Sequence, residues 1–305
     1  MSFESGKNSH PHESFNDPEI TRVIAEVNFE SLNNIFNDYA ERSGVDLDEV
    51  DLIEPSLIKK STSLTTVGSF QMTTKELYLS ERGLQMGFKL DPENDKVARI
   101  LSALIHEETH AFGGRSHSQH EEDMLAGLIK SRWQTTRSGF AEVSFSSEKF
   151  IDPREKFRWF NEGFVDELGA EVYGKYIQRE GVGPTDPEKN MDYAEMYPLA
   201  RLFVRSLRDR IAEESGVPEE VVWQSLIKLY VEGDGLLEEG VQEALDDIFS
   251  DKFIQRIASI GSSLSSPVDT LRVFSEVLNK EKVKKIIGSL SEVLSQKFEE
   301  MTRLR

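Results

Sequence analysis

Hydrophobic side chains recur every three or four residues along much of the chain, which is the spacing of one face of a helix. This spacing predicts a helix over 19–43, a second helix over about 91–112, and a succession of helices from about residue 155 onward. Gly113 and Gly114 mark the end of the second helix, because glycine readily adopts the left-handed conformation that closes helices. Most of the chain is therefore expected to be helical.

A different pattern occupies residues 49–90, where short β-branched or aromatic runs are separated by glycine and polar residues. Such runs are typical of strands, and they predict strands within 63–74, 75–81 and 83–90. A further strand or hairpin is expected within 136–145. The sequence thus predicts an α+β fold, in which a small mixed or antiparallel sheet comes first and a mainly helical C-terminal half follows.

The ends of the chain differ from its middle. The polar first 18 residues lack the apolar stretch of a signal peptide, and we expect them to form a disordered leader over 1–18. A chain of 305 residues suits one large domain, which we place at 19–250, followed by a helical extension at 251–305. No run approaches the roughly 18 apolar residues that a membrane span needs. These features predict a cytoplasmic protein with no membrane partner.

Composition narrows the classes of function. The formal net charge of −19 argues against a nucleic-acid partner, because phosphate binding requires a basic surface. The chain contains no cysteine, which excludes disulfides, thiolate ligands for zinc and a cysteine nucleophile. A metal site in this chain would therefore use histidine and carboxylate ligands.

The helix predicted over 91–112 contains the sequence HEETH, in which His106 and His110 are four positions apart. Side chains at this spacing project from the same face of a helix, one turn apart, so both histidines can bind one ion. Glu107 lies beside the first histidine, where its carboxylate can act as a base. The pattern has the form HExxH, which is a signature of zinc metallopeptidases.

A catalytic zinc ion needs three protein ligands and one open position for water, so a third ligand must come from elsewhere. His117 is one candidate, because HEETHAFGGRSH nearly matches the metzincin pattern HExxHxxGxxH, with the last histidine one residue late. Glu162 is the other candidate, in a predicted helix and four positions before Asp166. Apolar side chains surround these two acids, and a buried acidic pair is costly unless it binds something.

The segment RWFNEGFVDELG resembles the second zinc-binding helix of the gluzincin peptidases, which include the thermolysin-like enzymes and related zinc aminopeptidases. That helix carries NExxxD in one branch and WxNEG in the other. Both patterns are satisfied here by Trp159, Asn161, Glu162, Gly163 and Asp166. The resemblance implies that Glu162 is the third ligand. It also implies that Asp166 accepts a hydrogen bond from a ligand histidine and that Asn161 is a further orienting group.

A tyrosine provides a third similarity to the gluzincins. The segment EMYPLARLFVRSL resembles the part of those enzymes in which a tyrosine that stabilises the oxyanion precedes a hydrophobic helix. By position Tyr197 is the counterpart, and Tyr193, one helical turn earlier, is the reserve candidate. The chain lacks a GAMEN-type segment and has no histidine after His120, so it fits neither branch and is similar to a distinct, smaller gluzincin-like family.

The resemblance implies a function. We expect one Zn²⁺ per chain, bound by His106, His110 and Glu162, and hydrolysis of a peptide or protein substrate, as an endopeptidase. Glu107 is the expected general base and Tyr197 the expected oxyanion donor. The segment TTVGSFQM, before the zinc helix, is the expected edge strand along which the substrate binds.

Two other classes of function stay open at this stage. One is a metal-stabilised interaction module without turnover, and the other is a zinc hydrolase that acts on something other than a peptide. The presence of Glu107 argues against the first class, because a purely structural site needs no base. Nothing in the sequence discriminates the second class.

Overall fold

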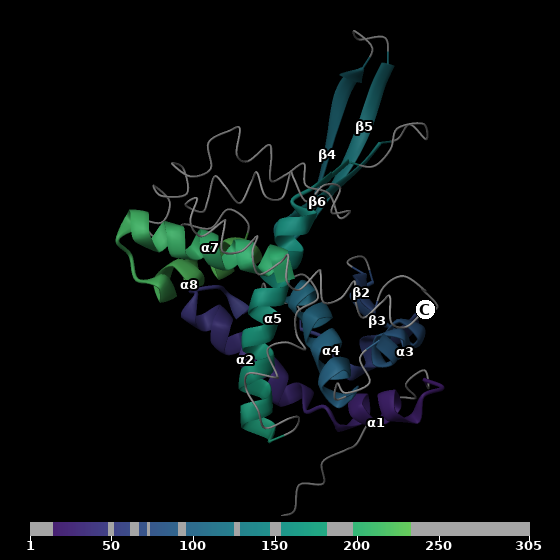
Figure 1. The fold of residues 1–305 in the computed structure, drawn as a ribbon. Coiled ribbons are helices and arrows are strands. Elements are labelled where there is room, and N and C mark those ends of the chain that lie inside the picture. Colours follow the sequence, from purple (N-terminus) through teal and green to yellow (C-terminus); the bar gives the residue numbers. More distant parts are fainter. Residues whose placement is uncertain are drawn as a thin grey trace, which may run out of the picture.

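Two helices, α4 (Lys96–Phe112) and α5 (Arg158–Glu180), lie against each other at the centre of the fold (Figure 1). α5 also packs on α2 (Phe29–Arg42) and on α7 (Pro198–Ser215), so the other helices are arranged around it. The described part is mainly helical with two small sheets, which confirms the predicted α+β class. The structure is a computed structural model, which describes residues 15–47, 52–61, 67–71, 74–90, 96–124, 129–146, 154–181 and 198–232.

The helix expected over 19–43 is divided into α1 (Pro18–Glu26) and α2. Val27 adopts an extended conformation, and the side chain of Asn28 accepts the backbone N–H of Ser31, which begins α2. The backbone N–H of Asn28 also donates to the hydroxyl of Tyr176 on α5, at 2.9 Å. The prediction of one continuous helix is wrong, because a cap and a contact with a distant helix end α1, and apolar spacing reveals neither.

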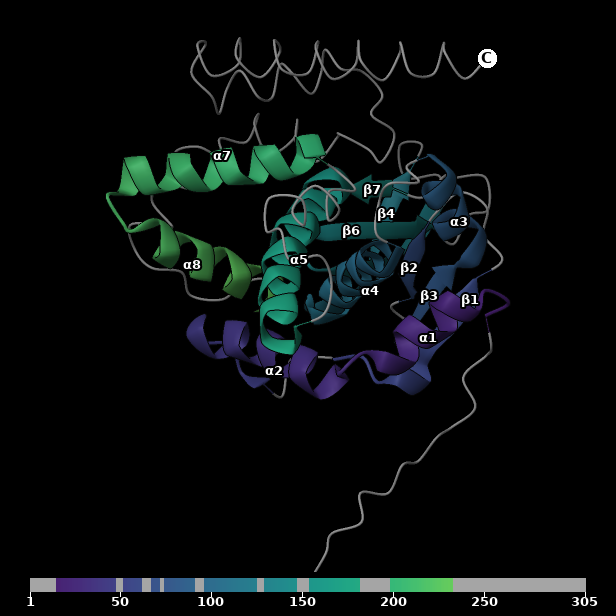
Figure 2. The same cartoon turned by 60° about the horizontal axis from the view of Figure 1, so that its bottom comes forward.

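The first sheet contains β1 (Ile58–Ser61), β2 (Gly68–Gln71) and β3 (Glu76–Ser80), in the order β1-β3-β2. A short 3-10 turn, η2 (Pro55–Leu57), leads into β1. β1 runs parallel to β3 and β2 runs antiparallel to it, so the sheet is mixed, which is one of the two predicted alternatives. β2 lies at an edge of this sheet, as expected, and contacts α4 (Figure 2).

Residues 83–90, which were expected to form a strand, belong to α3 (Glu81–Leu90). The hydroxyl oxygen of Ser80 accepts the backbone N–H of Gly83 at 3.0 Å, which is the hydrogen bond of a helix N-cap. An ion pair of 2.5 Å between the Lys60 ammonium of β1 and the Glu81 carboxylate ties the helix to the sheet. The strand prediction is wrong because it rested on alternating apolar residues and ignored the capping residue before them.

The second sheet is formed by β4 (Arg115–Met124), β5 (Ile129–Ser138), β6 (Ala141–Ser146) and β7 (Arg154–Lys156). All neighbours are antiparallel and follow in sequence order. β5 and β6 confirm the hairpin expected within 136–145. The sequence did not predict β4, because its residues are almost all polar and give no alternating pattern. β4 and β5 extend past the other strands as a two-stranded arm (Figure 1).

The helical second half, as far as the structure describes it, contains α5, α7 and α8 (Glu219–Glu232). α5 begins later than the sequence indicated, because the residues before it form β7. The Arg201 guanidinium on α7 forms an ion pair of 2.6 Å with Glu167 on α5. The indole N–H of Trp223 on α8 donates to Glu171, also on α5, at 3.0 Å. Polar contacts thus join both later helices to α5.

The predicted domain limits fall largely outside the described residues. Phe15 is buried and the side chain of Asp17 caps α1, so the packed part of the chain begins before residue 19. The extension expected at 251–305, and the helices expected after residue 232, lie outside the described part. Among the residues that the structure describes, no helix has both the length and the apolar character of a membrane span.

We expect the change Gly163→Ala to destabilise the protein, because α5 and α7 approach closely at this position. A Cβ at Gly163 would lie 2.5 Å from the carbonyl carbon and oxygen of Ala200, which are backbone atoms. Overpacking of this kind costs about 1–3 kcal/mol in the free energy of unfolding, which urea denaturation measures.

The matched control for this change is Gly174→Ala, on the same helix. A Cβ at Gly174 would have no atom within 4 Å, so this variant should gain about 0.4–1 kcal/mol from the reduced freedom of the unfolded chain. Equal free energies of unfolding for the two variants would contradict the close packing of α7 on α5.

Candidate metal centre

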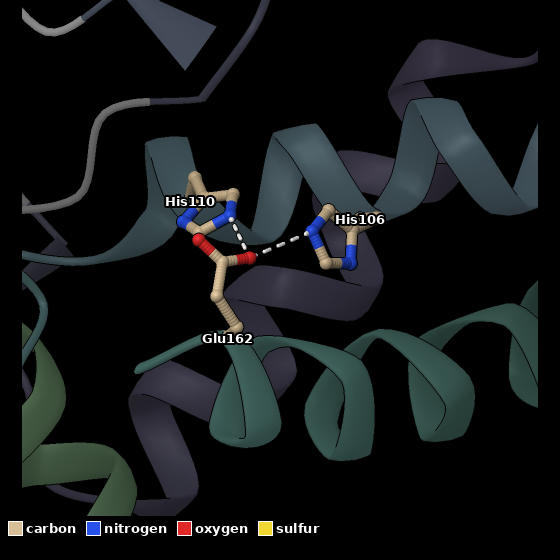
Figure 3. A group of neighbouring side chains, drawn as sticks. All are labelled: His106, His110 and Glu162. Carbon is tan, nitrogen blue, oxygen red and sulfur yellow. Dashed lines mark ion pairs between the residues drawn. The ribbon is translucent and has the colours of Figure 1, made fainter. Parts of the chain in front are cut away.

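The two histidines of HExxH lie in the last turns of α4, on the side that faces α5. His106 and His110 project from α4 towards α5, and the centroids of their rings are 5.0 Å apart (Figure 3). The apolar residues that surround them along the helix are buried in the hydrophobic core, among them Ala103, Leu104 and Ile105. Core packing therefore fixes the helix and, with it, the direction of both imidazole rings.

Glu162 on α5 supplies a third ligand atom. Its Oε2 lies 3.4 Å from Nε2 of His106 and 3.3 Å from Nε2 of His110 (Figure 3). Both distances exceed the usual range for an N–H···O hydrogen bond, about 2.7–3.2 Å. In a tetrahedral zinc site with bonds of about 2.0–2.1 Å, two ligand atoms are about 3.3–3.4 Å apart. All three atoms lie within 4.8 Å of one another, so this group can hold a metal ion.

The three ligand side chains differ in their contact with solvent. The side chain of His106 is 5% exposed, whereas those of His110 and Glu162 are 15% and 14% exposed. Water can therefore reach the group from the side of His110 and Glu162. A catalytic zinc site requires such access, because its fourth position binds water or substrate.

Asp166, one turn after Glu162 on α5, holds the ring of His106. Its Oδ1 lies 2.8 Å from Nδ1 of His106, and its side chain is fully buried. A neutral His106 that donates from Nδ1 to this carboxylate presents an unprotonated Nε2 towards Glu162. This is the arrangement in which a histidine binds a metal while a carboxylate fixes its ring.

Asn161 links His110 to the turn between β5 and β6. Its Nδ2 lies 3.4 Å from Nδ1 of His110. Its Oδ1 accepts the backbone N–H of Phe140 at 2.9 Å and that of Ala141 at 3.3 Å. The side chain that the sequence indicated as an orienting group thus also holds the second sheet against α5.

Electrostatic coupling within the group changes two pKa values. Burial by itself would raise the pKa of Glu162, but the nearby charges of His110 and His106 hold it well below its ordinary value. Burial by itself would lower the pKa of His106, but the hydrogen bond to Asp166, the adjacent Glu162 and the charges of Asp166 and Glu107 raise it well above 6.5. Without a metal ion, these neighbours favour the protonated form of His106, and a bound ion would take the place of that proton.

Glu107 is buried beside the ligand group and faces the edge strand β2. The backbone N–H of Phe70 donates a hydrogen bond to its carboxylate. A Cβ built on Gly68 would lie 2.6 Å from Oε1 of Glu107, so glycine at this position leaves room for the carboxylate. Burial raises the pKa of Glu107 above its ordinary value. The structure thus places a buried carboxylate between the potential metal-binding group and a strand edge.

Three residues that the sequence indicated are not placed in this group. Tyr197 and Tyr193 lie outside the described residues. His117 lies in β4, where its backbone pairs with that of Thr136, and its side chain is outside the described part. The roles of these residues stay predictions, and among the described residues Glu162 is the carboxylate that joins the two histidines.

Sequence reasoning missed two supports of the group. One is the β5–β6 turn at Phe140, which Asn161 binds. The other is Tyr230 on α8, which donates its hydroxyl to the carbonyl oxygen of Thr109, a residue 121 positions away. No local pattern marks either contact, because each joins elements that are distant in the sequence.

Comparisons with known proteins found no relative of this chain. No family model, curated protein or solved structure matches the chain. The similarity to gluzincin peptidases therefore rests on the short motifs, and the function has to be argued from the geometry of the group.

We expect the purified protein to bind one zinc ion per chain, and the variant Glu162→Ala to lose it, because a ligand atom is removed. Metal analysis after dialysis measures the content. His117→Ala is the matched comparison, since it removes the other candidate ligand, and it should keep its zinc. If Glu162→Ala kept its zinc and His117→Ala lost it, His117 would be the third ligand.

We also expect the affinity for zinc to keep rising with pH above 6.5, because zinc must displace the proton that His106 holds up to its raised pKa. The stability of the metal-free protein changes with pH in the opposite direction, because the contribution of His106 falls as pH rises. The proton on His106 stabilises the fold at pH values below the unfolded pKa, and this contribution is lost as pH rises through the folded pKa.

Zinc titrations at a series of pH values test this dependence. Asp166→Asn is the control, because it removes a charge that raises the pKa of His106. It should move the midpoint of the rise in zinc affinity to lower pH. If the zinc affinity of the wild-type protein reached the midpoint of its rise at or below pH 6.5, the pKa of His106 would not be raised.

Proposed function

We propose that the protein is a zinc-dependent peptidase, whose metal ion is held by His106, His110 and Glu162 and whose general base is Glu107. The observation that carries the proposal is the convergence of three metal-ligand atoms beside a buried carboxylate that faces a strand edge. When bound, zinc would lower the pKa of a water molecule to about 7 and polarise the carbonyl group of a substrate. The donor set, two imidazoles and a carboxylate, is one that catalytic zinc commonly has.

The position of Glu107 supports the role of base. It follows a ligand histidine directly on α4, and the charges of both histidines and of Glu162 act on it, so its carboxylate lies next to the ligand group. The hydrogen bond from Phe70 fixes the direction of the carboxylate. A base in this position can take a proton from water and deliver it to a leaving amine.

The edge strand β2 supports a peptide as the substrate. Val67 accepts the N–H of Ser80 through its carbonyl oxygen, so the backbone just before β2 is paired with β3. The N–H of Phe70 is directed instead towards Glu107. An extended peptide that pairs with β2 on the side away from β3 would run past Glu107 and the ligand group, and backbone pairing of this kind is a general way to bind peptides.

Further features of the mechanism stay predictions. Tyr197, with Tyr193 as the reserve, is the expected donor to the oxyanion, and such a donor contributes about 10² to 10³ in turnover. An endopeptidase activity follows from the resemblance to the gluzincins alone. Zinc hydrolysis of another class of substrate would use the same ligands and the same base.

The change Glu107→Gln tests the proposal. We expect zinc content and thermal stability to be retained and hydrolysis to fall by about 10²–10⁴, because the amide cannot accept the proton. Cleavage of an unstructured peptide library, followed by mass spectrometry, measures the activity. Glu26→Gln, an exposed carboxylate on α1, is the matched control and should keep full activity.

Three results would speak against the proposal. Loss of zinc in Glu107→Gln would make this residue a ligand. Unchanged turnover in that variant would remove its role as a base. A zinc-loaded wild-type protein that cleaves no peptide of the library would favour a structural zinc site or another substrate.

A further inference from the structure

The end of α4 that carries His110 needs support from other elements. The last four carbonyl groups of a helix have no partner within it, and the final turn frays unless other groups bind them. The carbonyl of Ala111 accepts a hydrogen bond from the Arg115 guanidinium at 3.2 Å. The carbonyl of Thr109, directly before His110, accepts the N–H of Gly113 at 3.3 Å, which is a long hydrogen bond.

Tyr230 on α8 provides the second donor to the Thr109 carbonyl. Its hydroxyl donates to this oxygen at 3.0 Å, and the residue is fully buried. Burial raises the pKa of Tyr230 far above its ordinary value, so the hydroxyl keeps its proton and remains a donor. The ring packs on Phe164 of α5 at a centroid distance of 4.6 Å, which fixes the hydroxyl in place.

Glycines make room for this ring on two sides. A Cβ built on Gly113 would lie 2.7 Å from both the Cζ and the hydroxyl oxygen of Tyr230. A Cβ built on Gly139 would lie 2.0 Å from its Cε2. The backbone of Tyr230 takes part as well, because its carbonyl oxygen accepts the N–H of Gly114 at 3.2 Å.

Tyr230 therefore contacts three described elements around His110. It binds the last turn of α4 through Thr109, and it packs on α5 two residues after Glu162. It also packs on Phe140, at a centroid distance of 5.4 Å, in the turn that Asn161 holds. Because Tyr230 contacts both α4 and α5, it restricts the distance between His110 on α4 and Glu162 on α5.

We infer that Tyr230 is a positioning residue for the metal centre, which acts through the Thr109 carbonyl to hold His110 in place relative to Glu162. The inference rests on the proposed metal centre and not on the proposed hydrolysis. Without the hydroxyl, the Thr109 carbonyl loses its shorter hydrogen bond and keeps the long one from Gly113. Metal binding would then have to order this turn, and the affinity would fall.

The change Tyr230→Phe tests the inference, because it removes the hydroxyl and keeps the ring. We expect the dissociation constant for zinc, measured by competition with a chelator, to rise by about 3- to 10-fold, the effect of one ordinary hydrogen bond. The absorption spectrum of the cobalt(II)-substituted protein should change as well, because it reports the arrangement of the ligands.

Tyr39→Phe is the matched control. Tyr39 is also a buried tyrosine, and its hydroxyl donates to Glu171 at 2.8 Å, so a tyrosine hydrogen bond is lost away from the Thr109 carbonyl. This variant should lower the melting temperature and leave both the zinc affinity and the cobalt spectrum unchanged. A purely structural role for Tyr230 predicts the same result for Tyr230→Phe, and that result would overturn the inference.

A second variant covers the case in which Tyr230→Phe does not fold. Gly113→Ala keeps the hydroxyl but places a methyl group where the ring lies, so it should weaken zinc binding in the same direction. Wild-type affinity in this variant would overturn the inference and leave the proposed function intact. A wild-type protein that binds no zinc would overturn both.

Discussion

The crossing of α4 and α5 buries a group of ionisable side chains, and the rest of the described structure supports that crossing. A buried carboxylate is costly unless it has a partner. Here Asp166 is paired with His106, and Glu162 lies against both histidines. Because the partners come from two different helices, a small change in the crossing would separate them. α2 and α7 pack along α5, and α8 closes the end of α4, which restricts such changes.

The distances from the two histidines to Asp166 and to Glu162 differ in kind. Asp166 approaches His106 to 2.8 Å, an ordinary distance for a charge-assisted hydrogen bond. Glu162 lies at 3.3 and 3.4 Å from the two Nε2 atoms, which is longer than an ordinary hydrogen bond. The larger spacing would suit atoms around a common ion. The same crossing therefore provides a carboxylate that holds the ring of His106 and a group that could hold a metal ion.

The sequence predicts the parts of the site that depend on spacing along one helix. The two histidines are four positions apart, as are Glu162 and Asp166, and helical geometry alone puts each pair on one face. It does not predict contacts that join distant elements. The break at Asn28 depends on Tyr176, the start of α3 depends on a cap at Ser80, and the support of Thr109 comes from Tyr230. The sequence did predict a small first sheet, with mixed pairing as one alternative, and the edge position of β2. It did not predict β4, because the polar residues of this strand do not alternate with apolar ones.

Glu107 is a buried carboxyl group beside the two histidines and Glu162. A carboxyl group in this position raises the cost of folding, since it is buried and its pKa is shifted away from the charged form. A metal site that served stability alone would be better built with an apolar side chain here. Instead, Gly68 leaves space for the carboxylate, and the N–H of Phe70 directs it. Local features that oppose stability in an otherwise well-packed protein are typical of functional sites, and this one lies beside three ligand atoms that face water on one side.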